Sequence, residues 1–131
     1  MVKSASYYAI SIGLIYILIG LISGFGMIFI AVAGDGYLPD SIVSAHSHFI
    51  CMSILILIVG LIMKSWAYEI EGKWRKRLGS MKASVILLSL GAIIVFIFLF
   101  IQVPEPALIG YILFLIGFFI VAINWLNIVK K

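Results

Sequence analysis

The chain has 131 residues, of which 65% are hydrophobic and only 11% are charged. A soluble domain of this size would have to expose much of that apolar side chain, whereas lipid solvates the outer face of a membrane protein. The composition therefore excludes an ordinary soluble domain and indicates an integral membrane protein. The single cysteine, Cys51, also excludes an intrachain disulfide and any multi-cysteine zinc or iron–sulfur site.

Four stretches are long and apolar enough to cross the hydrocarbon core, which takes roughly 20 helical residues for about 30 Å. They run over residues 6–33, 41–67, 80–102 and 106–129. The first is too long for the apolar region of a signal peptide, so we expect a retained transmembrane helix. Short links with glycine or proline should make neighbouring helices antiparallel. We predict one all-α transmembrane domain over residues 1–131, a four-helix bundle with up-down-up-down topology.

The basic residues predict the orientation in the cell membrane. All nine fall at the two termini or around the middle connection: Lys3, Lys64, Lys73, Arg75, Lys76, Arg77, Lys82, Lys130 and Lys131. Positive residues are retained on the cytoplasmic side, so both termini and the middle loop should be cytoplasmic. The net charge of +4 thus has a topogenic explanation, and we expect no nucleic-acid partner.

Small residues recur at spacings of four or seven along each predicted helix. Such spacing places them on one helical face, along which another helix can approach closely. The stripes are Ala9, Gly13, Gly20 and Gly24; His46, Ser53 and Gly60; Ser84 and Gly91; and Gly110, Gly117 and Asn124. We interpret them as helix-packing seams, although small side chains would also leave room for a flat cofactor.

The only two histidines, His46 and His48, stand near the start of the second predicted helix, with Asp40 or Ser41 as its N-cap. The predicted orientation places both histidines near the extracytoplasmic face. Residues two apart on a helix point about 200° away from each other, so the pair cannot ligate one ion unless the helix unwinds. We expect His46 to face the interior and His48 to face a different neighbour.

A haem b is the first interpretation of this site, because a histidine on a transmembrane helix is a common axial ligand. No other helix carries a histidine, so a bis-histidine haem within one chain is excluded. Met27 is the internal candidate for the second ligand, and a partner subunit is the other source.

Two further ligands and one cofactor-free alternative remain open. Copper or zinc could bind at the outer surface through His46 and His48 with Asp35, Asp40 or Glu105. A quinone could accept a hydrogen bond from a histidine. The histidines could also be structural and bond Ser44, Gln102 or a loop carbonyl. No catalytic residues are expected, because the sequence has no serine–histidine–acid order, phosphate loop or buried carboxylate pair.

The segment from Gly36 through Ala45-His46-Ser47-His48-Phe49, continuing into the apolar run to Met63, resembles a known type of helix. It is similar to the "AHAHLNLLGW"-type helix of membrane proteins related to the catalytic subunit of haem-copper oxidases and nitric oxide reductases. It also resembles small four-helix membrane proteins of unknown function with the same His-x-His. The resemblance covers roughly the first half of the chain. It implies that His46 or His48 corresponds to a haem-ligating position, but the further histidines of an oxygen-reducing centre are missing.

Together these patterns predict a small multi-pass subunit of a membrane electron-transfer or oxidase-type complex, with haem b held by His46. The alternative is a cofactor-free structural subunit that packs against larger membrane partners. Expected partners are the lipid bilayer, other membrane subunits or further copies of the chain, and a quinone.

Overall fold

The computed structural model describes residues 2–34, 36, 38–69 and 78–129. These residues form four helices: α1 (Val2–Ala33), α2 (Asp40–Glu69), α3 (Leu78–Phe100) and α4 (Pro104–Val129), with no strand among them. All four are long and apolar enough to cross a membrane. The predicted all-α fold is therefore confirmed for the described residues, and four helices able to span a membrane support a multi-pass membrane protein.

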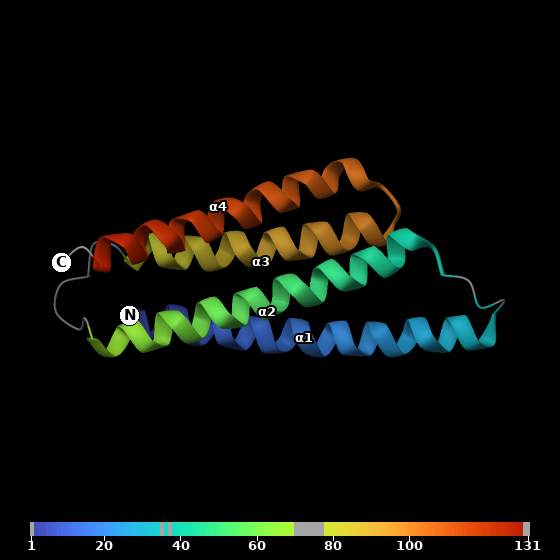
Figure 1. Cartoon of the computed structure of the whole chain (residues 1–131), viewed down its shortest axis with the longest axis horizontal. Helices are drawn as coiled ribbons and strands as arrows, with labels where there is room; N and C mark the ends of the chain where they lie inside the picture. The colour runs from blue at the N-terminus through green and yellow to red at the C-terminus, as the bar shows by residue number, and fades with distance from the viewer. Residues whose placement is uncertain (1, 35, 37, 70–77, 130–131) are drawn as a thin grey trace.

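The helices form two hairpins, α1 with α2 and α3 with α4, which join through α2 and α3 (Figure 1). The start of α1 and the end of α4 lie at the same end of the molecule as the end of α2 and the start of α3. The α1–α2 and α3–α4 links lie at the opposite end, which we call the link end. As a result α1 is an edge helix that packs mainly on α2.

Glycines set the close spacing inside each hairpin, as the predicted seams require. A Cβ added to Gly13 would lie 2.8 Å from the backbone nitrogen of Leu57 in α2. A Cβ on Gly91 would lie 2.6 Å from the carbonyl oxygen of Gly110 in α4. Because lipid is as apolar as the side chains, such close van der Waals packing is what holds membrane helices together. These stripes are therefore seams between backbones, and they leave no open space at these two crossings.

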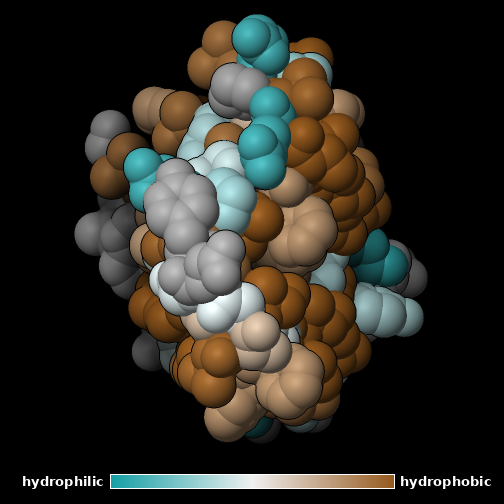
Figure 2. All heavy atoms as spheres, turned by 90° about the vertical axis from the view of Figure 1, so that its right-hand side faces the viewer, coloured by the Kyte–Doolittle hydropathy of each residue, from teal (hydrophilic) through white to brown (hydrophobic). Residues whose placement is uncertain are grey.

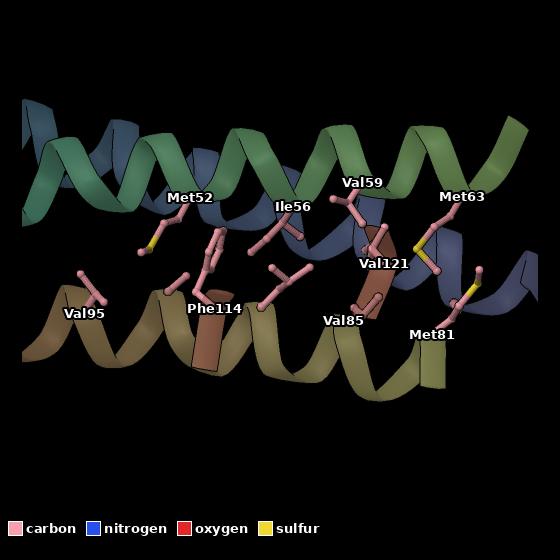
Figure 3. Packing of buried hydrophobic residues seen from close by; sticks show 13 residues of the cluster. Met52, Ile56, Val59, Met63, Met81, Val85, Val95, Phe114 and Val121 are labelled. Atoms are coloured by element: carbon pink, nitrogen blue, oxygen red, sulfur yellow. The ribbon is translucent and has the colours of Figure 1, made fainter. Parts of the chain in front are cut away.

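The core lies between the two hairpins, where α2 faces α3 and receives side chains from α4 (Figure 3). Its main side chains are Met52, Ile56, Val59, Met63, Met81, Val85, Leu88, Val95, Phe114 and Val121. The buried hydroxyls of Ser53, Ser84 and Ser89 donate to carbonyls of their own helices; Ser53, for example, donates to the Phe49 carbonyl at 2.6 Å. Such bonds let small polar side chains lie in an apolar seam without leaving a donor unpaired.

The helices begin or end up to four residues away from the predicted bounds, and the end of α3 and the start of α4 have a clear physical reason. The helix α3 ends at Phe100 because Gln102 has a left-handed φ of 63°. The Val103 amide donates to the Phe98 carbonyl and the Gln102 amide to the Leu99 carbonyl, which is a Schellman motif, normally built on glycine. Pro104 then begins α4 two residues before the predicted start.

At the start of α2, Asp40 is already helical, so the prediction of Asp40 or Ser41 as N-cap is wrong. The Pro39 carbonyl accepts from the Val43 amide at 3.3 Å, which puts the cap position at Pro39. Asp40 instead supplies a carboxylate to the first turn, where the helix dipole favours negative charge.

Candidate functional site

The imidazole of His46 lies in the seam between α2 and α1, near the link end. It is partly buried, and its Nδ1 lies 3.2 Å from the Oγ of Ser23 in α1. Gly24 makes room for the ring, because a Cβ there would lie 2.9 Å from Cε1 and 3.3 Å from Nε2 of His46. The seam glycine and the histidine are thus one feature: the ring occupies the space that a side chain at position 24 would fill.

Ser23 connects the His46 ring to the backbone of α1. Its hydroxyl donates to the Gly20 carbonyl at 2.8 Å. The same oxygen lies 3.2 Å from Nδ1 of His46, and the tautomer of the ring sets which of these two atoms donates.

His48 points to a different neighbour, as the helical geometry predicts. Its exposed ring meets the ring of Tyr111 in α4 edge-on, with centroids 5.5 Å apart and an interplanar angle of 81°. The helix α2 is continuous through both histidines. The two imidazoles therefore cannot share one ion in this conformation.

Aromatic side chains fill the interior one turn inward from His46. Phe49 is only 2% exposed, and its ring lies 5.3 Å from that of Tyr16 and 4.5 Å from that of Phe96. Tyr16 belongs to α1, Phe49 to α2 and Phe96 to α3. This cluster ties α1, α2 and α3 together beneath the histidine.

The other predicted ligands are spread around the link end. Asp40 and Glu105 are exposed in the first turns of α2 and α4, and Met27 is partly buried on α1. Figure 2, which looks at this end, shows hydrophilic residues beside broad hydrophobic surface. Asp35 lies outside the described residues.

No group of three or more histidine, cysteine, aspartate or glutamate side chains that could hold a metal ion occurs within the described ranges. A copper or zinc site that includes Asp35 stays a prediction. Because the two imidazoles point apart in this conformation, a metal ion would be bound by one histidine together with carboxylates.

A haem between His46 and Met27 does not fit the seam. The porphyrin would have to stand between α1 and α2, yet the His46 ring already fills the space beside Gly24, where an added Cβ would lie 2.9 Å from Cε1. Haem ligation by His46 therefore stays a prediction in which a partner supplies the second ligand and most of the pocket.

We expect the chain expressed alone, with haem supplied, to show no Soret band and no α band in a reduced-minus-oxidised spectrum. The physical reason is that the His46 ring packs at Gly24, so α1 and α2 would have to separate to admit a porphyrin between them. A stoichiometric haem spectrum that disappears in His46→Ala and persists in His48→Ala would contradict this expectation.

Ser23 and Tyr111 are the site residues that sequence reasoning missed. The signal for Ser23 was its place between Gly20 and Gly24, since a hydroxyl on a seam has to find a partner there. The contact of Tyr111 depends on how the two hairpins meet, which no local pattern reports.

Comparison with protein-family models, curated proteins and solved structures finds no match for this chain.

Proposed function

We propose that the chain is a multi-pass accessory subunit of a larger membrane complex, and that α1 is the helix that contacts the partner. The main observation behind this proposal is that large apolar side chains at the link end of α1 have no neighbour in the described chain. Phe25 is 74% exposed, Phe29 is 75% exposed and Val32 is 81% exposed. No other part of the described chain packs over these side chains.

The length of α1 favours a protein partner over lipid alone. Its apolar stretch Ala5–Ala33 has 29 residues, whereas Met81–Phe100 in α3 has 20. At 1.5 Å per residue these are about 44 Å and about 30 Å. Fitting α1 into a core of about 30 Å by tilt alone would need about 45°, beyond the usual range. Covering its end with an apolar partner surface removes that mismatch.

The proposed orientation follows the distribution of charge: termini and middle loop cytoplasmic, link end outside, with the helices crossing up, down, up and down. The exposed acids Asp40 and Glu105 at the link end are consistent with it. The likeness of the His46 segment to an oxidase-type helix makes an electron-transfer complex the class we propose.

We expect Phe25→Ala/Phe29→Ala to reduce the fraction of the chain that co-migrates with a larger complex by about tenfold, because two aromatic anchors leave the contact. The measurement is native electrophoresis of mildly solubilised source membranes, followed by mass spectrometry of the complex. The matched control is Leu108→Ala/Phe119→Ala on α4, where the side chains are 62% and 64% exposed.

Two results would contradict this proposal. One is equal loss of the complex with the α4 pair, which would assign no special part to α1. The other is a complex that contains only copies of this chain, which would make it a homo-oligomer and not an accessory subunit.

A further inference from the structure

Lys64 lies in the seam between α2 and α1, at the end of the bundle opposite the link end. Its side chain is partly buried, and its Nζ lies over the ring of Tyr7 in α1, 5.5 Å from the ring centroid. The pair continues the close crossing at which a Cβ added to Gly60 would lie 2.7 Å from the backbone nitrogen of Ile10. Lys64 follows that glycine by four residues, and Tyr7 precedes that isoleucine by three, so each lies one turn farther along the same helical face. An aromatic ring thus holds the ammonium group at the mouth of the seam.

This cation has no anionic partner in the described part of the chain. The acidic side chains described there are those of Asp40 and Glu105, which lie at the link end. Among the described residues, neither the ammonium group of Lys64 nor the hydroxyl of Tyr7 makes a hydrogen bond. Tyr7 is 46% exposed, so both donors are open to a ligand from outside the bundle.

The depth of Lys64 matches the boundary of a bilayer. The helical rise from Asp40 to Lys64 along α2 is about 36 Å. The hydrocarbon core is about 30 Å thick, so a bilayer with Asp40 at one boundary has Lys64 at the other. Phospholipid headgroups lie at that level, and basic side chains near helix ends extend toward them.

From this geometry we propose that Lys64 and Tyr7 bind the headgroup of a phospholipid with net negative charge. The ammonium group pairs with the phosphate, and the Tyr7 hydroxyl donates a second hydrogen bond to it. A zwitterionic headgroup carries its own cation and therefore gains less from a lysine. The ring of Tyr7 fixes the position of the ammonium group, which distinguishes this site from the general attraction of a basic surface. The site needs only a membrane boundary at this end, and it rests neither on the orientation across the membrane nor on the contact of α1 with a partner.

The test uses the delipidated full chain in dodecyl maltoside, titrated with phosphatidylglycerol or with phosphatidylcholine. Native mass spectrometry resolves each bound lipid and gives the Kd of the first. We expect phosphatidylglycerol to bind about fivefold more tightly, which corresponds to about 1 kcal/mol, the gain from one lysine near an anionic headgroup. Inorganic phosphate in excess tests a soluble anion as the ligand, and it should leave phosphatidylglycerol bound.

Two matched pairs of variants separate a defined site from general charge. Lys64→Gln and Lys82→Gln each remove one positive charge at this end, where Lys82 is exposed near the start of α3. Tyr7→Leu and Tyr8→Leu each remove one exposed ring, and Tyr8 is 63% exposed. We expect Lys64→Gln to abolish the preference for phosphatidylglycerol and Tyr7→Leu to reduce it by about threefold, whereas both control variants keep it. Helix content and monodispersity of each variant show that it is folded.

Four results would overturn the proposal. The first is an equal Kd for the two lipids. The second is an equal loss of preference in Lys64→Gln and Lys82→Gln, which would indicate attraction by net charge alone. The third is an unchanged preference in folded Tyr7→Leu. The fourth is displacement of phosphatidylglycerol by inorganic phosphate, which would assign the site to a soluble anion.

Discussion

Gly91→Val is expected to destabilise the isolated protein by about 3 kcal/mol, at the upper end of the usual cost of overpacking. The first added carbon would lie 2.6 Å from the Gly110 carbonyl oxygen and 2.8 Å from the Phe114 amide nitrogen. Both atoms belong to the α4 backbone, which cannot give way as the end of a flexible side chain can. The α3–α4 hairpin must therefore separate along its length or lose its register.

Pulse proteolysis during SDS-induced unfolding in mixed micelles measures the change in the free energy of unfolding. Gly26→Val is the matched control, because a Cβ at Gly26 would have no atom within 4 Å. It introduces the same side chain into an apolar helix without a clash. Loss of less than about 1 kcal/mol in Gly91→Val, or an equal loss in both variants, would show that the crossing is not a close backbone contact.

The sequence predicts the helices and seams well because both depend on local chemistry. Span length follows from the hydrocarbon thickness, and repeated small residues leave a face on which only a close neighbour can pack. Ser53, Gly60, Ser84, Gly91, Gly110 and Gly117 are all buried, as their stripes predict. The opposite directions of His46 and His48 also follow from helical geometry alone.

Helix ends and contacts between hairpins were less predictable for identifiable reasons. Nothing in the Ile101-Gln102-Val103 sequence marks Gln102 as the left-handed residue, since glycine usually takes that place. The bond between Ser23 and His46 depends on the relative rotation of α1 and α2. The edge position of α1 depends on which helices pair across the two hairpins, and a four-span pattern is equally compatible with a closed ring of helices.

The two ends of α1 have different surroundings in this fold. The half of α1 nearer its N-terminus packs closely against α2 through glycine and alanine. A Cβ added to Gly60 of α2 would lie 2.7 Å from the backbone nitrogen of Ile10 in α1. Its outer half carries Phe25 and Phe29 away from the rest of the chain. His46 packs on α1 between these two halves, at Ser23 and Gly24. The proposed partner contact can therefore be tested at Phe25 and Phe29, which lie away from the packing against α2.

Phe49→Ala should destabilise the isolated protein by about 2–3 kcal/mol. In a membrane the transfer of the ring from lipid to protein contributes little, so the cost is mainly the cavity. At about 24 cal/mol per Å³, removing roughly 100 Å³ of ring costs about 2.4 kcal/mol. Phe49 is 2% exposed and contacts Tyr16 and Phe96, so its ring cannot be replaced by lipid without opening the contacts between α1, α2 and α3.

Phe29→Ala makes the same chemical change on the exposed outer end of α1, where the ring is 75% exposed. In the isolated protein it should change the free energy of unfolding by less than about 0.5 kcal/mol, since no internal contact is lost. The same proteolysis assay measures both variants in parallel. Equal losses would mean that Phe29 already has a partner within the chain, which would contradict both the cavity argument and the proposed role of α1. We expect a large loss in the free energy of unfolding only in Phe49→Ala, and loss of the native complex only in Phe25→Ala/Phe29→Ala. This pair of results would separate the residues that stabilise the bundle from those that bind its partner.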